Sequence, residues 1–161
     1  MKVTCIAVGR IKEKFYADAV GEYQKRLSRY IKLEIIEVPD EKIPDGAGAK
    51  EEEAVKNKEG CRILKLIEER PSAYVAVLAV EGKELDSVEF AKWMEKKGIE
   101  GTGHIVFVIG GSLGLSDEVK RRADFSLSFS KMTFPHMLMR VIFLEQLYRS
   151  CRIIKNEPYH K

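Results

Sequence analysis

Runs of apolar, mostly β-branched residues alternate along the chain with amphipathic or charged segments. The runs predict strands, and the segments between them predict helices because apolar residues recur there at three- and four-residue spacing. The predicted strands cover 3–8, 33–38, 74–80, 105–109 and 125–129, and the predicted helices cover 14–30, 50–69, 87–97, 116–123 and 135–153. Strands that alternate with helices indicate an α/β fold with a mainly parallel sheet.

The stretch from His104 to His136 is the most informative part of this pattern. The unbroken run at 105–109 is typical of a strand buried on both faces, and Gly110 and Gly111 end it abruptly. Ser116 is a suitable N-cap for the following helix. A strand, a glycine turn and a helix predict a ligand site at the carboxyl end of the strand. An ordinary tight turn explains one Gly-Gly pair equally well.

The last predicted helix, 135–153, carries apolar residues around nearly its whole circumference. A helix of this kind is buried, and a chain of 161 residues rarely encloses one completely, so we expect one face to meet a second subunit. Arg140 lies on the same helical face as His136 and Leu144, and a charge among apolar neighbours needs a partner. Arg140 is therefore expected to serve a site or an interface.

Length and composition indicate one globular domain over residues 1–161, with 45% hydrophobic and 33% charged residues. No apolar run approaches the roughly 20 residues of a membrane span, and the short apolar run at the N-terminus is interpreted as a strand instead of a signal peptide. Cys5, Cys61 and Cys151 are far apart, which favours neither a zinc site nor a disulfide framework. We expect buried thiols in a reducing cytoplasm.

The positive charge gathers near the C-terminus. Residues 131–161 hold six Lys or Arg and two Glu, a net charge of +4, against −1 for the rest of the chain. A local basic segment favours a polyanionic partner, and a solvated basic tail explains this one fact as well.

Several catalytic and binding motifs are missing from the chain. It has no GxGxxG fingerprint, P-loop or GxSxG elbow, and its three His residues lack acidic partners at metal-ligand spacing. The glycine turn instead suits a neutral or cationic nucleotide-like ligand held by backbone groups. Ser130 and Thr133 add hydroxyls on a second loop, whereas Ser126 and Ser128 are better explained as the polar face of a strand.

Seven segments together resemble the RlmH family of SPOUT-class methyltransferases, which act on a pseudouridine of large-subunit (23S) ribosomal RNA. The resemblance runs over the whole chain. It is carried by Ala7–Lys14, Glu37–Lys42, Gly110–Leu115, Leu127–His136, Arg140, Glu145–Arg149 and Tyr159–Lys161.

The resemblance implies properties that the pattern alone does not show. The fold would be a single-domain α/β knot with a C-terminal trefoil, and the protein would be a homodimer packed through the last helix. The cofactor would be S-adenosylmethionine, with no metal. Its pocket would fall on Leu78, Gly110, Phe129, Ser130, Lys131, Met132, Thr133 and Phe134.

The implied reaction is methylation of N3 of the pseudouridine, on the assembled ribosome in the cytoplasm. N3 carries a proton that must leave as the nitrogen attacks the methyl group, so the site must align the reactants and help remove that proton. The candidate catalytic residues are His136, Arg140, Tyr159 and His160, with Glu145 as a further helper. The choice of base stays open. The alternative function is a non-catalytic RNA- or ribosome-binding module, which cofactor binding would distinguish.

Overall fold

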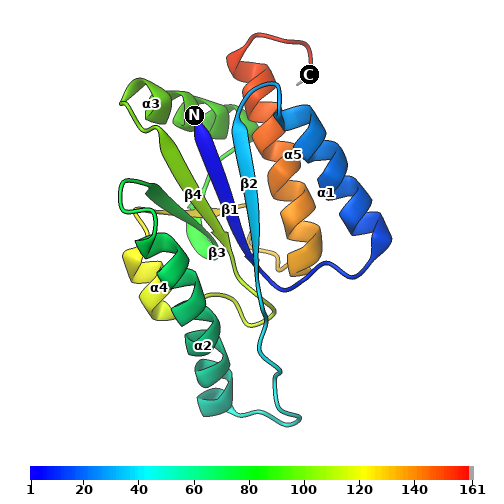
Figure 1. The fold of residues 1–161 in the computed structure, drawn as a ribbon, viewed down its shortest axis with the longest axis vertical. Helices are drawn as coiled ribbons and strands as arrows, with labels where there is room; N and C mark the ends of the chain where they lie inside the picture. Colours follow the sequence, from blue (N-terminus) through cyan, green and yellow to red (C-terminus); the bar gives the residue numbers. More distant parts are fainter. Residues whose placement is uncertain (160–161) are drawn as a thin grey trace.

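The structure is a computed structural model that describes residues 1–159 and contains five strands and five helices (Figure 1). The strands are β1 (Lys2–Val8), β2 (Lys32–Val38), β3 (Tyr74–Glu84), β4 (His104–Ile109) and β5 (Phe125–Ser128). The helices are α1 (Lys14–Leu27), α2 (Ala49–Glu68), α3 (Ser87–Ile99), α4 (Asp117–Arg122) and α5 (His136–Ile154). Every predicted element is present within a few residues of its predicted bounds.

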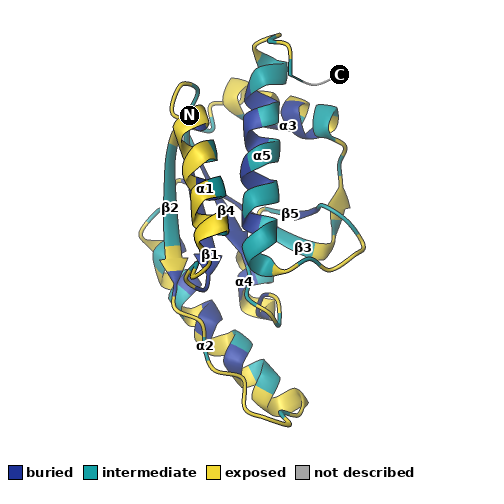
Figure 2. Ribbon diagram, turned by 90° about the vertical axis from the view of Figure 1, so that its right-hand side faces the viewer, coloured by how far each residue is buried: buried dark blue, intermediate teal, exposed yellow. Residues whose placement is uncertain are grey.

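The five strands form one parallel sheet in the order β2-β1-β4-β3-β5. Helices cover both faces: α1, α3 and α5 pack on one, and α2 and α4 on the other (Figures 1 and 2). The mainly parallel α/β fold is thus confirmed. The order of the strands is new, because hydrophobic periodicity carries no information about which strands are neighbours.

Burial on both faces explains why the sequence of β4 is apolar without alternation. Ile105, Phe107 and Ile109 belong to the core under α1, α3 and α5, whereas Val106 and Val108 belong to the core on the α2 side. All five side chains are at most 4% exposed. A strand buried on both faces has no polar face to display.

Strand β3 is longer than predicted. The predicted strand ends at residue 80, but β3 continues to Glu84 after an irregularity in its pairing with β5 between Leu78 and Lys83. A Cβ atom at Gly82 would lie 2.7 Å from the carbonyl carbon of Leu127, so only glycine lets the two backbones approach this closely. The segment 79–82 bulges out of the sheet as a result.

The chain crosses the sheet again after β5. This strand lies at the outer edge beside β3, whereas α5 packs against α1 and α3. Residues 129–135 therefore run from the edge of the sheet back towards its middle (Figure 2). This crossing fits the trefoil knot that the family resemblance implies.

Two of the three cysteines are buried as expected, and one is not. Burial raises the pKa of Cys5 to about 12 and that of Cys151 to about 11, which makes both thiols inert near neutral pH. Cys61 is exposed, and its prediction as a buried thiol was wrong, because it lies outside the set of α2 residues that are buried. Among residues 1–159, no helix has both the length and the apolar character that crossing a membrane requires.

Candidate active site

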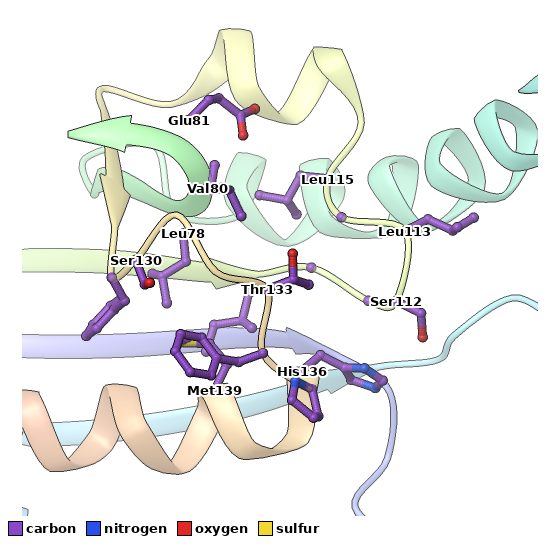
Figure 3. Close-up of a pocket in the computed structure, with 18 of the residues that line it drawn as sticks. Leu78, Val80, Glu81, Ser112, Leu113, Leu115, Ser130, Thr133, His136 and Met139 are labelled. Carbon is purple, nitrogen blue, oxygen red and sulfur yellow. The ribbon is translucent and has the colours of Figure 1, made fainter. Parts of the chain in front are cut away.

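A cavity of about 680 Å³ lies at the carboxyl ends of β4 and β5 and beside the middle of β3. Its wall comes from three segments, 78–81, 110–115 and 129–136, with Lys120 and Met139 beside them. Figure 3 shows Leu78, Leu115 and Thr133 converging on the cavity from these three segments. The volume falls within the usual range of small-molecule sites, at the edge where open parallel sheets bind ligands.

The turn after β4 is shaped by glycine. A Cβ atom at Gly110 would lie 2.8 Å from the carbonyl carbon of Gly114, and Gly114 itself has a φ of +83°. The hydroxyl of Ser116 then accepts a hydrogen bond from the Val119 N–H, which confirms its predicted role as the N-cap of α4. The turn is therefore tight, with its backbone exposed to the cavity.

The loop after β5 is held by its own hydroxyl groups. The Ser130 side chain accepts a hydrogen bond from the Met132 N–H at 3.0 Å, and the Ser128 hydroxyl donates to the Ser130 carbonyl at 3.1 Å. Seven of the eight residues predicted to hold the cofactor line the cavity; Lys131 is exposed and is not part of the wall. The seven are Leu78, Gly110, Phe129, Ser130, Met132, Thr133 and Phe134.

The bulge 79–82 contributes a wall that the sequence did not predict. Glu81, on this bulge, points toward the cavity (Figure 3). It forms an ion pair with Lys120 of α4, which also lines the cavity. The hydrogen bond from Lys120 lowers the pKa of the Glu81 carboxyl group. The pair ties the bulge to α4 across the mouth of the cavity.

His136, the first residue of α5, lies at one end of the cavity (Figure 3). Burial lowers its pKa below the usual histidine value, and the nearby Arg140 guanidinium lowers it further. The imidazole is therefore neutral near pH 7 and can accept a proton. It packs so close to Gly9 that a Cβ atom there would lie 3.2 Å from Nε2.

Arg140 lies behind the cavity and is not part of its wall. Its side chain is 1% exposed and donates to the Glu37 carboxylate at 2.8 Å and to the Gly9 carbonyl at 2.9 Å. The Val8 carbonyl accepts a third hydrogen bond at 3.3 Å, and Nε has no partner among the described residues. Arg140 thus connects α5 to the ends of β1 and β2, and through them supports His136.

Tyr159 lies at the other end of α5. Its hydroxyl donates to Glu145 at 3.2 Å, its ring packs edge-on against Tyr148, and Arg149 lies over the ring. Burial, with the charge of Glu145, raises the pKa of Tyr159 to about 12. The pair of Glu145 with Arg149 is present at 2.6 Å. His160, also predicted as a catalytic residue, lies outside the described residues.

Sequence analysis missed Glu59, which is 5% exposed and accepts a hydrogen bond from the Glu41 N–H at 3.0 Å. Burial raises the pKa of its carboxyl group. The signal was present in the pattern of α2, where Glu59 occupies one position of a buried stripe with a spacing of four. The other members of that stripe are Val55, Ile63 and Ile67.

The comparisons with known proteins agree with this geometry. The family described as "Predicted SPOUT methyltransferase" matches residues 1–160. The chain is 56% identical over 161 residues to ribosomal RNA large subunit methyltransferase H 1 of Clostridium perfringens, and 54% identical to ribosomal RNA large subunit methyltransferase H of Clostridium kluyveri. Each match covers 100% of both chains.

A solved structure is similar to the fold at low sequence identity. It is a probable methylase family protein from Haemophilus influenzae, with a TM-score of 0.52 and 12% sequence identity. The match covers 99% of this chain and 70% of that one.

Proposed function

The chain belongs to the SPOUT methyltransferases and, within them, to the family of ribosomal RNA large subunit methyltransferase H, and we propose that it methylates large-subunit ribosomal RNA with S-adenosylmethionine as the methyl donor. The observation that carries this proposal is the convergence of seven of the eight predicted cofactor residues on one cavity of about 680 Å³. The finer proposal is that N3 of a pseudouridine is the acceptor, on the assembled ribosome in the cytoplasm.

The cavity fits a nucleoside-like methyl donor. Leu78, Phe129 and Phe134 offer apolar surface for a flat ring, and Gly110, which carries no side chain, also lines the cavity. The hydroxyl of Thr133 lies beside them. When bound, S-adenosylmethionine supplies a methyl group on a positively charged sulfur.

His136 is our choice for the group that accepts the N3 proton. It lines the cavity, is neutral near pH 7, and would take up the proton that the nitrogen must release as it attacks the methyl group. Arg140 acts as a positioning residue in this proposal. Its contacts with Glu37 and the Gly9 carbonyl fix the first turn of α5, and a base displaced by even about 1 Å loses much of its effect.

We propose that two copies of the chain pack through α5. Met137, Leu138 and Ile142 are half-buried on this helix, yet none of them packs against either core of the described chain. A stripe of apolar residues without a partner favours a second copy.

The dimer would also bring the C-terminal tail to a cavity. Tyr159 follows the far end of α5, but it turns back along the helix and its hydroxyl contacts Glu145. Glu145 lies nine residues after His136, or about 14 Å along the axis at 1.5 Å per residue, and Tyr159 does not line the cavity of its own chain. We propose that Tyr159 and His160 contribute to the site of the partner and help to hold the target base, with the basic C-terminal segment near phosphate.

The test is methyl transfer to ribosomes purified from cells that lack this protein. Wild-type protein with S-adenosylmethionine is expected to add one methyl group per ribosome, and mass spectrometry of nuclease fragments should place it on N3 of a pseudouridine. Binding to ribosomes without cofactor binding or methyl transfer would instead establish the alternative, a non-catalytic ribosome-binding module.

A further inference from the structure

A second, smaller cavity of about 180 Å³ adjoins the main one. The two share four lining residues, Gly111, Ser112, Leu113 and His136. The smaller cavity also has walls that the main one lacks, from the loop 40–43 and from Val55 and Glu59 of α2. Molecules bound in the two cavities would therefore lie next to each other, which is the arrangement that a transfer between two reactants requires.

Glu59 is the unusual group in this second cavity. Its residue is only 5% exposed, and one carboxylate oxygen, Oε1, accepts the Glu41 N–H. Within residues 1–159 the other oxygen, Oε2, has no hydrogen-bond donor among the contacts of this side chain. This oxygen is not sealed inside the protein, so it is accessible from the cavity, where a ligand that brings an N–H group can donate to it.

The turn after β4 leaves room for this carboxylate. A Cβ atom at Gly111 would lie 3.2 Å from Glu59 Oε2 and 3.0 Å from the Val8 side chain. Gly60, the next residue of α2, lets the helix approach α4 closely, because a Cβ atom there would lie 2.3 Å from the Ser116 hydroxyl. Gly60 and Gly111 thus allow the Glu59 carboxylate to lie beside the backbone of the turn after β4.

We propose that this second cavity receives the ring of the target pseudouridine and that the Glu59 carboxylate accepts a hydrogen bond from its N1–H. The inference rests on the proposed function and names the residue that selects the substrate. Uridine is joined to ribose through N1 and has no hydrogen there, whereas pseudouridine is joined through carbon and keeps an N1–H donor. A buried acceptor is the group that distinguishes the two bases, because uridine would leave it unpaired.

The simpler explanation is that Glu59 only supports the loop after β2 through the Glu41 N–H. That role needs one oxygen and does not account for the position of the other beside the cavity. A metal occupant is not favoured either, since the described residues contain no group of three or more His, Cys, Asp or Glu side chains that could hold one.

The experiment compares two substrates: ribosomes that carry pseudouridine at the target position, and ribosomes from cells lacking the pseudouridine synthase, which carry uridine. Wild-type protein is expected to methylate the first at least about tenfold faster, a difference of about 1.4 kcal/mol. In Glu59→Gln the amide can still accept the Glu41 N–H, but it presents donors to the cavity. This variant should lose about tenfold on pseudouridine and should show almost no preference between the two substrates.

The matched control is Glu53→Gln, on the same helix, where the carboxylate is partly exposed and pairs with Lys56. It should keep the wild-type preference. Calorimetry with S-adenosylmethionine shows whether each variant retains the cofactor site. If Glu59→Gln does not fold, wild-type protein is tested on ribosomes reconstituted with N1-methylpseudouridine at the target position, where the same loss relative to pseudouridine is expected.

Three outcomes would overturn the proposal: equal wild-type rates on the two ribosomes, an unchanged preference in Glu59→Gln, or normal methylation of N1-methylpseudouridine. The failure of wild-type protein to methylate either ribosome would be a different result. It would contradict the proposed function itself, so the two failures are distinguishable.

Discussion

The guanidinium of Arg140 lies 2.8 Å from the carboxylate of Glu37, and this contact joins the first turns of α5 to the end of β2 across 103 residues of sequence. Because Arg140 also binds the carbonyls of Val8 and Gly9, Arg140→Leu leaves three acceptors without their donor. We expect the free energy of unfolding to fall by about 2–4 kcal/mol, somewhat less than for a fully buried pair because Glu37 is partly exposed. Urea denaturation of the wild-type protein and the variant measures this loss of unfolding free energy.

The control for this prediction is Arg26→Gln, which removes an exposed pair with Glu22 on α1. It should change the free energy of unfolding by less than about 1 kcal/mol. Equal effects of the two substitutions would show that Arg140 is not the connection described here.

Gly110→Val should abolish binding of S-adenosylmethionine. Even a Cβ atom at this position would lie 2.8 Å from the Gly114 carbonyl carbon and 3.1 Å from Leu115 Cγ, so valine would distort the turn that lines the cavity. Titration calorimetry should detect no binding, whereas Gly21→Ala on α1, where a Cβ atom meets nothing within 4 Å, should bind normally. Normal binding by Gly110→Val would mean that the cofactor site lies elsewhere.

The acid limb of the pH–rate profile should belong to His136. Its pKa in the folded protein lies below the ordinary value of about 6.5, so activity should persist somewhat below pH 6.5 and fall as the imidazole becomes protonated. In His136→Gln this limb should disappear along with most of the activity. His104→Gln is the control: burial also lowers the pKa of His104, but this residue is at the amino end of β4, and the cavity is at the carboxyl end.

The lowered pKa of His136 also affects the stability of the fold. The unfolded chain binds a proton at His136 more readily than the folded one, so this residue lowers stability as the pH falls through about 6.5. Removing the imidazole should flatten that part of the curve of stability against pH.

The pH–rate profile gives the outcome that would contradict the assignment. If its acid limb survives in His136→Gln, another group removes the proton.

Leu138→Glu should convert the proposed dimer into a monomer. Wild-type protein at micromolar concentration should scatter light as a species of about twice the 18.4 kDa chain mass. A carboxylate in an apolar interface is costly, so the variant should scatter as a single chain. Ile99→Glu, at a residue that is 81% exposed on the end of α3, should remain a dimer. A monomeric wild-type protein would contradict the proposal.

Deletion of residues 158–161 should leave dimerisation and cofactor binding intact while methyl transfer falls at least about tenfold, or about 1.4 kcal/mol of transition-state stabilisation. The reason is that the tail would serve the partner's cavity. A mixture of the truncated chain with Gly110→Val should recover activity, because one mixed site has both an intact cavity and an intact tail. Full activity of the truncated chain alone would show that the tail has no part in the reaction.

The elements were predictable because periodicity reports burial residue by residue, as the run at 105–109 shows. The resemblance pointed to residues that line one cavity, since its motifs fall on turns that the sheet brings together. What stayed hidden depends on contacts between distant segments. Glu37 meets Arg140, and Glu81 meets Lys120, only after the strands have taken their order. Glu59 was detectable as a charged residue in a buried stripe of α2, but the sequence could not show that it faces a cavity.

Strand β1 lies inside the sheet, between β2 and β4. Because of this position, the chain can fold only late and as a whole. Val3 pairs with both Leu33 and Ile105, so the middle of the sheet cannot close until more than half of the chain is present. Pairing between such distant segments slows folding, because loop entropy is lost before the contacts form. Both cavities require residues on each side of this closure. Truncated products of synthesis should therefore be inert, and should not compete with the complete enzyme for its substrate.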